Sequence, residues 1–196
     1  MSTVELPPSP WPELRVLELG TGSEPLLQRF FDENPLYFES VHGEPARPTE
    51  AHEEIHDALP AGWGHTKKWV LGYANPQGSL VAMATLVSDF LAPSVWHIGT
   101  FIVATSRHGN GDAQVLYQNL ESWTVRHGAR WLRLGVVQGN LRAERFWERQ
   151  GFIQTRLRPD VAMGRLTNTL RVMFKPLAGG ALADYLALVE RDRPES

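Results

Sequence analysis

The feature that most constrains the fold of this chain is a glycine-rich turn between a strand and a helix. The pattern predicts a strand over Val95–Val103, the turn over 106–112 and a helix over Asp112–Arg126. The strand is apolar on both faces, so we expect it at the centre of a sheet. Glycines in such a turn let the backbone approach an anion, and the helix start offers it N–H groups. The sequence therefore predicts an anion site beside a central strand.

The turn does not match the two common nucleotide-binding motifs. The dinucleotide motif needs a third glycine where this chain has Gln114, and the phosphate-binding loop needs a Gly-Lys-Ser/Thr segment that this turn lacks. Taken alone, Gly109-Asn110-Gly111 is better explained as a tight turn that starts a helix.

The remaining chain alternates between strands and helices. Strands are predicted over 14–19, 68–74, 80–88, 131–137, 152–158 and 170–175, and helices over 25–33, 49–59, 141–150 and 181–191. We expect the Pro- and Gly-rich residues 35–48 to form a loop and residues 1–13 to be flexible. The order predicts one mixed α/β domain over residues 1–196.

Composition excludes several classes of protein. The 196 residues include seven Trp, eight Phe and four Tyr, too many aromatic residues for a disordered chain. No apolar run approaches the ~18–20 residues that span a bilayer, and the first residues lack a basic and then apolar signal segment. We therefore expect a cytoplasmic protein with no membrane partner. Since the chain has no Cys, it has no disulfide, no Cys-ligated metal and no thiol nucleophile.

Charge is distributed unevenly along the chain. Residues 1–100 contain five Lys or Arg against thirteen Asp or Glu, whereas residues 101–175 contain twelve against five. Either the basic part binds an anion and the acidic part a cation, or the two parts pair within one fold. The Arg residues form no basic run, so we expect no nucleic-acid partner.

A second motif follows the turn, and together the two resemble the Gcn5-related N-acetyltransferase (GNAT) superfamily over 95–155. The family's acetyl-CoA signature, (Gln/Arg)-x-x-Gly-x-(Gly/Ala), is similar to His108-x-x-Gly111-x-Ala113. Its second signature is an Asn followed by Ala-x-x-Phe-Tyr-x-x-x-Gly-Phe. The matching residues here are Asn140, Ala143, Phe146-Trp147 and Gly151-Phe152.

The resemblance implies a fold and an activity. The fold is a mixed α/β (α+β) domain with a six- to seven-stranded sheet that splays after the fourth strand and carries helices on both faces. Residues 95–155 form the acetyl-CoA-binding core. Outside the resemblance, apolar positions at helical spacing predict a C-terminal helix over residues 180–191. That helix packs on the sheet or on a second subunit, which leaves a homodimer open. The activity is N-acetyl transfer from acetyl-CoA to a primary amine of a small molecule or peptide.

The resemblance also implies which residues contact acetyl-CoA. The backbone of Phe101, Ile102 and Val103 pairs with the pantetheine arm, and Asn140 contacts that arm or the acetyl group. The remaining expected cofactor residues are Arg107, His108, Gly109, Asn110, Gly111, Asp112, Ala113, Phe146 and Trp147. Two positions depart from the family: Asp112 replaces an aliphatic residue, and Trp147 replaces the Tyr that usually protonates the leaving thiolate.

His97 is the first candidate for the general base, with Asp89 as a second base or as the group that orients His97. His97 lies six residues before Val103, where the histone-acetylating branch of the superfamily has a glutamate. Its pKa range suits proton transfer, but a structural histidine is an equal alternative. Since the indole of Trp147 is not a useful acid, another group or water protonates the thiolate, or the chain is a silent acetyl-CoA-binding module.

Two further patterns lie in the acidic half. His52-Glu53-Glu54-Ile55-His56 matches the His-Glu-x-x-His motif of zinc hydrolases, but without an evident third ligand, so we expect no metal. An aromatic and acidic set suits an amine cation. Its members are Tyr37, Phe38, Glu39, Glu44, Glu50, Glu53 and Glu54.

Overall fold

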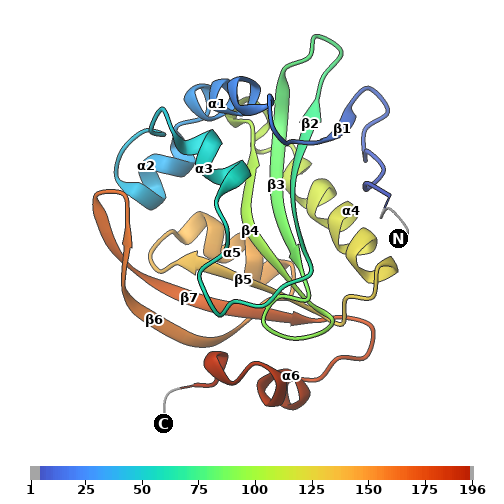
Figure 1. The fold of residues 1–196 in the computed structure, drawn as a ribbon, viewed down its shortest axis with the longest axis vertical. Helices are drawn as coiled ribbons and strands as arrows, with labels where there is room; N and C mark the ends of the chain where they lie inside the picture. The colour runs from blue at the N-terminus through green and yellow to red at the C-terminus, as the bar shows by residue number, and fades with distance from the viewer. Residues whose placement is uncertain (1–4, 195–196) are drawn as a thin grey trace.

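The strands form one mixed seven-stranded sheet in the order β1-β2-β3-β4-β5-β7-β6 (Figure 1). The computed structural model describes residues 5–194. The strands are β1 (Arg15–Glu18), β2 (Lys67–Ala74), β3 (Leu80–Ser88), β4 (Val95–Val103), β5 (Trp131–Val137), β6 (Ile153–Met163) and β7 (Leu166–Pro176). All neighbouring pairs are antiparallel except β4 and β5, which are parallel. The predicted mixed sheet, with Val95–Val103 at its centre, is confirmed.

Helices cover both faces of this sheet, as predicted. They are α1 (Glu24–Glu33), α2 (Leu36–His42), α3 (Glu50–His56), α4 (Asp112–Arg126), α5 (Leu141–Arg149) and α6 (Leu182–Leu188). Leu27 and Phe31 of α1 pack with Ile102 of β4 on one face. Trp123 of α4 packs against stacked Trp69 and Trp96 on the other. The alternation of side chains along the strands thus divides one core into two apolar layers.

The sheet splays after β4, at the place expected. Residues Val95–Ile98 of β4 pair with Trp131–Leu134 of β5, and the pairing ends there. On the other edge of β4, Gly99 and Thr100 together face the single residue Thr85, which is a β-bulge. The bulge bends β4 away from β5, so that the two strands separate at the sheet centre.

The prediction of a loop over residues 35–48 is wrong for the first half of that range, because Leu36–His42 form helix α2. Pro35 occupies the N-cap position of α2, where its missing N–H costs no hydrogen bond. Asn34-Pro35 therefore ends α1 and also starts the next helix. Phe38 and Val41 bury the inner face of α2.

The β6–β7 hairpin is longer than predicted. Each strand has 11 residues, and the tip of the hairpin reaches α2. There, Arg165 N donates to the carbonyl of His42 at 2.8 Å, and Asn168 Nδ2 donates to the carbonyl of Val41 at 2.8 Å. These bonds connect the hairpin tip to the helices on the acidic side of the molecule.

Both ends of the described chain pack on the domain. Tyr185 of α6 and Val189 are buried against Trp131 and Phe174, so the C-terminal helix packs on its own sheet. At the other end, Trp123 Nε1 donates to the carbonyl of Glu5 at 2.8 Å. Leu6 and Trp11 pack against the apolar cluster that includes Trp123, so the segment expected to be flexible is anchored at these positions. Residues 1–4 fall outside the described part. Within residues 5–194, no helix is long and apolar enough to cross a bilayer.

Candidate active site

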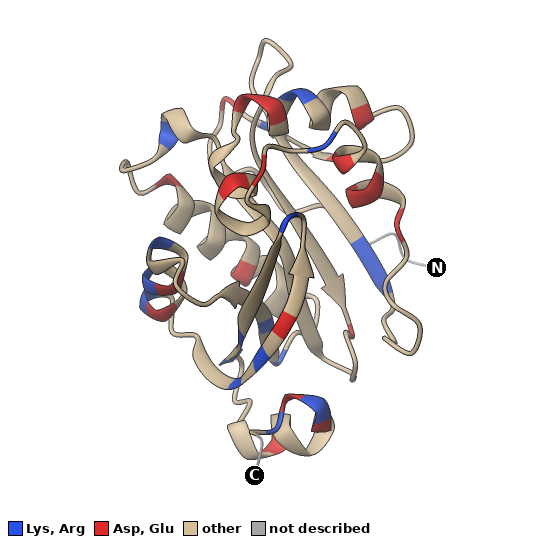
Figure 2. Ribbon diagram, turned by 90° about the vertical axis from the view of Figure 1, so that its left-hand side faces the viewer, with Lys and Arg blue, Asp and Glu red and all other residues tan. Residues whose placement is uncertain are grey.

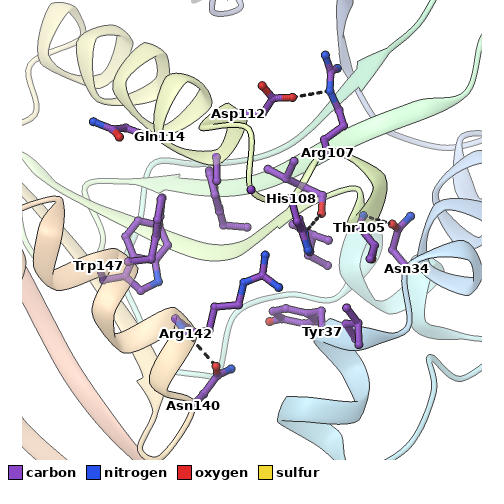
Figure 3. A pocket seen from close by; sticks show the side chains of 18 of the residues that line it. Asn34, Tyr37, Thr105, Arg107, His108, Asp112, Gln114, Asn140, Arg142 and Trp147 are labelled. Carbon is purple, nitrogen blue, oxygen red and sulfur yellow. Dashed lines mark hydrogen bonds and ion pairs between the residues drawn. The ribbon is translucent and has the colours of Figure 1, made fainter.

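Two hollows open where β4 and β5 diverge. The first, here called the large cleft, has a volume of about 490 Å³ and lies between the turn after β4, the start of α4, helix α5 and helix α2 (Figure 3). The second, the small cleft, has about 260 Å³ and extends along β4 and β5 to His97. Both are lined by Tyr37, Phe101, Asn140, Ala143 and Trp147. The two clefts therefore meet at the splay.

The glycine-rich turn leaves a row of N–H groups in the large cleft. Gly109 and Gly111 have φ of +86° and +84°, which favour glycine. Gln114 N and Val115 N donate to the carbonyl of Gly111. In residues 5–194, however, the N–H groups of residues 109–113 take part in no hydrogen bond. Unpaired N–H groups at the start of a 15-residue helix are an arrangement that favours anions.

Asp112, the charged residue that departs from the family pattern, forms an ion pair with Arg107. Arg107 Nε donates to Asp112 Oδ2 at 2.6 Å, and the guanidinium lies 4.8 Å from the centre of the Trp11 ring. His108 Nε2 lies 2.8 Å from the carbonyl oxygen of Val103 and so holds the turn against β4. The ion pair and the His108 contact thus stabilise the turn.

Two cations that the sequence analysis missed line the large cleft. Arg142 and Arg149 project from α5, and neither forms an ion pair within the part of the chain that is described. Figure 3 shows Arg142 reaching across the cleft towards His108. Arg142, Phe146 and Arg149 are spaced i, i+4, i+7, which places all three on one face of α5. This spacing can be read from the sequence, and it predicts that one face of α5 carries two cations.

The open edge of β4 and an aromatic wall continue the large cleft. Ala104 N donates to Val81 O, so the alternation of the strand directs the N–H groups of Phe101 and Val103 to the edge that β5 has left. The Phe101 and Phe146 rings stack at 5.9 Å, and Trp147 is only 7% exposed. This combination of peptide groups and apolar surface suits a long aliphatic amide.

In the small cleft, His97 Nε2 makes no hydrogen bond to any of residues 5–194. Its Nδ1 lies 3.1 Å from the carbonyl oxygen of Arg133 and donates to it, since a carbonyl only accepts, which leaves Nε2 without a proton. Burial, and then the positive charge of Arg133, lower the pKa of His97 to about 3. Its ring stacks on Phe90 at 4.4 Å. The imidazole is therefore neutral at neutral pH, and burial makes it a weaker base than the sequence position alone suggested.

Asp89 lies in the loop after β3. Its carboxylate accepts hydrogen bonds from Thr66 Oγ1 at 2.7 Å and from Ser94 N at 2.8 Å. In the described residues it makes no hydrogen bond to His97, whose orienting partner is the carbonyl of Arg133. A role for Asp89 as base or as orienting group remains a prediction.

A polar cluster from α2 and α3 meets the bulge of β4. The Glu54 carboxylate accepts hydrogen bonds from Thr100 Oγ1 at 2.9 Å and from Thr85 Oγ1. Burial, followed by the charge of Glu54, raises the pKa of Tyr37. Figure 3 shows this hydroxyl directed into the cleft. Tyr37 is thus a neutral hydroxyl at the junction of the clefts.

The acidic side chains of α1, α2 and α3 and the Arg side chains that line the large cleft lie on different helices. Acidic residues gather on α1, α2 and α3 (Figure 2). Most ion pairs join residues within the same part of the chain, although Arg107–Glu13 and Arg165–Glu44 join the two parts. The acidic helices therefore give one side of the splay a negative charge, opposite the Arg residues of α5.

A family comparison agrees with this geometry. Residues 27–152 match the Acetyltransferase (GNAT) family. The chain belongs to the GNAT family. A comparison with curated proteins finds no match.

Solved structures of GNAT proteins share the fold. An acetyltransferase from Thermus thermophilus is 18% identical with a TM-score of 0.64, and the match covers 84% of this chain and 97% of that one. The spermidine N-acetyltransferase from Vibrio cholerae, solved with CoA and spermine, is 16% identical with a TM-score of 0.61, covering 84% and 95%. The ribosomal-protein-S18-alanine N-acetyltransferase from Escherichia coli is 15% identical with a TM-score of 0.60, covering 86% and 97%.

The predicted cofactor residues of this GNAT domain come together. All of them except the exposed Asn110 line the large cleft. Asn140 caps α5, with its Oδ1 accepting from Ala143 N at 3.3 Å. The sequence analysis missed the wall from the α1–α2 junction, where Asn34 Oδ1 accepts from Thr105 N at 2.7 Å.

The zinc-hydrolase motif lies outside both clefts. His52 and His56 share one face of α3, with ring centres 4.6 Å apart. Glu53, the base in such a motif, accepts hydrogen bonds from Arg47 Nη2 at 2.5 Å and from Thr49 Oγ1 at 2.7 Å. The catalytic part of the motif is therefore engaged elsewhere, and the geometry does not favour a hydrolase.

Proposed function

We propose that this GNAT protein transfers an acetyl group from acetyl-CoA to a primary amine by direct attack. The observation that carries the proposal is the row of unpaired N–H groups of residues 109–113. It lies in a cleft that continues along the open edge of β4 to the junction with the small cleft. Acetyl-CoA has the matching order of groups, with a pyrophosphate for the turn, an amide-bearing arm for the edge of β4 and a thioester for the junction.

The residues of the large cleft suit each part of this co-substrate. The N–H groups of the turn and the cations Arg142 and Arg149 bind the phosphates. The free edge at Phe101 and Val103 pairs with the pantetheine amides, and the ring of Phe146 covers the aliphatic arm. The thioester then reaches the junction, where backbone N–H groups of β4 polarise its carbonyl.

The acceptor enters through the small cleft as an amine of a small molecule or peptide. The rings of Tyr37 and Phe101, which line both clefts, attract a cationic group to the junction. The Glu54 carboxylate lines neither cleft, but it is hydrogen-bonded to Thr100 and adds a negative charge near Tyr37. The Vibrio cholerae relative is named for a polyamine and the Escherichia coli relative for the amine of a protein. These names support an amine as the acceptor of this chain, and they are compatible with both a small molecule and a peptide.

The proton transfers can be assigned to two residues. The acceptor first loses one proton to solvent, and the neutral amine then attacks the thioester carbon, so that a C–N bond forms and the C–S bond breaks. His97 Nε2 accepts the proton of the ammonium formed on attack and passes it to solvent, although its pKa of about 3 makes it a weaker base than a free imidazole. The Tyr37 hydroxyl donates a proton to the departing thiolate, the role for which Trp147 is unsuited.

The proposal is tested by turnover on a panel of amines. Acetyl-CoA is mixed with a polyamine, an amino acid, a peptide and a neutral amine, while thiol release is followed and products are identified by mass spectrometry. We expect turnover with cationic primary amines. Turnover only on neutral or anionic acceptors contradicts the role of Glu54. Tight acetyl-CoA binding with no turnover on any amine supports the second candidate, a silent binding module, which the Trp147 departure favours.

A further inference from the structure

Three potential metal ligands converge on the outer surface of α3. Glu24, the first residue of α1, and His52 and His56 of α3 each present one ligand atom, and these atoms lie within 4.8 Å of one another. His56 Nε2 is already 2.6 Å from Glu24 Oε1. The sequence motif showed the two histidines, and the fold adds the missing third ligand from a segment 28 residues upstream of His52.

The set has the chemistry of a transition-metal site. Two imidazoles at i and i+4 on one helix face, with one carboxylate, make an N₂O donor set that Zn²⁺ and related cations prefer. Both histidines are exposed, and Glu24 is partly buried. Solvent is therefore available to supply a fourth ligand.

The spacing is close to what a metal needs. With metal–ligand distances of about 2.0–2.1 Å, ligand atoms of a tetrahedral site lie about 3.3 Å apart. Metal binding requires the three side chains to move to that spacing, with His56 Nε2 and Glu24 Oε1 moving apart from their present 2.6 Å. His52 makes no hydrogen bond in the described part of the chain, so its ring is free to turn. The carboxylate of Glu24 is also held towards the site, since Gly22 N donates to its Oε2 at 2.7 Å.

We propose that Glu24, His52 and His56 form a binding site for a divalent cation of the zinc class. The site is structural, because Glu53 is bound to Arg47 and neither cleft reaches it. A bound cation links the start of α1 to α3, the helix that places Glu54 against β4. The site rests on these three ligands and does not depend on acetyl transfer.

Titration calorimetry with zinc chloride on the metal-free full-length protein tests the site. We expect one equivalent to bind with a Kd in the micromolar range. His52→Ala and His56→Ala each weaken binding at least about tenfold, and Glu24→Gln weakens it to a lesser extent. His65→Ala, which removes an exposed histidine outside the cluster, leaves the Kd unchanged.

Thermal unfolding of the same variants gives a second readout. Zinc at about 100 times its Kd raises the Tm of the wild-type protein by roughly 5–10 °C, and His52→Ala abolishes that rise. The proposal is overturned if wild type binds no zinc at 100 µM, a concentration of order 10 times the expected Kd. It is also overturned if His52→Ala and His56→Ala bind as tightly as wild type. Neither result bears on turnover, so the two proposals fail separately.

Discussion

Arg133 and Asp192 form a buried, bidentate ion pair beside His97. Arg133 Nε donates to Asp192 Oδ2 at 2.6 Å and Nη2 donates to Oδ1 at 2.9 Å, while Arg133 Nη1 lies 3.4 Å from His97 Nδ1. Tyr185 also donates to the same carboxylate. The C-terminal segment is therefore connected through one side chain to the wall of the small cleft.

Removing this carboxylate is expected to destabilise the fold. Asp192→Ala leaves the guanidinium of Arg133 buried without a partner, which costs about 3–5 kcal/mol of unfolding free energy. Asp184→Ala removes an exposed acid from α6 and should change the unfolding free energy by less than about 0.5 kcal/mol. Urea denaturation of both variants measures the difference. Equal stabilities for the two variants contradict a structural role for the pair.

The lowered pKa of His97 predicts a pH-dependent stability. His97 titrates near pH 3 in the folded state and near 6.5 when unfolded, so the unfolded chain binds the extra proton between these values. Stability is fully present above pH 6.5 and falls with decreasing pH, by up to about 1.4 kcal/mol per pH unit from this group. His97→Asn keeps a donor for the Arg133 carbonyl but does not titrate.

Urea denaturation of wild type and His97→Asn at several pH values measures this effect. The difference in unfolding free energy between them should change steadily from pH 6.5 to pH 4, with wild type losing more. A difference that stays constant over this range means that His97 is protonated normally in the folded protein.

Alanine variants of two glycines with the same positive φ distinguish a loss of acetyl-CoA binding from a general loss of stability. Gly111 and Gly78 have φ of +84° and +83°, and an added Cβ meets no atom within 4 Å at either position. Alanine at either position should cost about 1 kcal/mol or more of stability. Only Gly111→Ala displaces the N–H groups of the turn, and we expect it to raise the Kd for acetyl-CoA about tenfold or more in calorimetry. A similar loss of affinity in Gly78→Ala rules out a local effect.

Tyr37 and Tyr117 provide a matched test of the thiolate acid. Tyr37→Phe removes the hydroxyl at the junction of the clefts and should lower kcat by about 10²-fold, with the Kd for acetyl-CoA nearly unchanged. Tyr117 packs against Trp147, but its hydroxyl donates to Glu121, away from the junction. Tyr117→Phe should therefore retain wild-type kcat. Steady-state kinetics that show no loss in Tyr37→Phe remove Tyr37 from the mechanism.

The cofactor side of the site was largely predictable from the sequence, because it is local. The strand, turn and helix over residues 95–126 carry their own periodicity and glycines, and the structure reproduces the predicted bounds of β4 and α4. The pairing of Arg107 with Asp112 could not be predicted, since it depends on side-chain conformations within the turn.

The acceptor side was harder to predict, because it depends on contacts between distant segments. Glu54 reaches Thr100 only because α3 crosses the bulge of β4, 46 residues further along the chain. The Asn34-Pro35 pair ended one helix as predicted, but its second role, starting α2, placed Tyr37 in the cleft. The link from Asp192 to Arg133 likewise spans 59 residues and leaves no local pattern.

Hydrogen–deuterium exchange with and without acetyl-CoA tests the central claim most directly. The N–H groups of residues 109–113 have no partner in the described structure, so they should exchange rapidly in the free protein. Acetyl-CoA should slow their exchange, together with that of residues 101–103 at the open edge of β4. Unchanged exchange in both segments at saturating acetyl-CoA, or protection elsewhere in the domain, contradicts the assignment of the large cleft to this co-substrate.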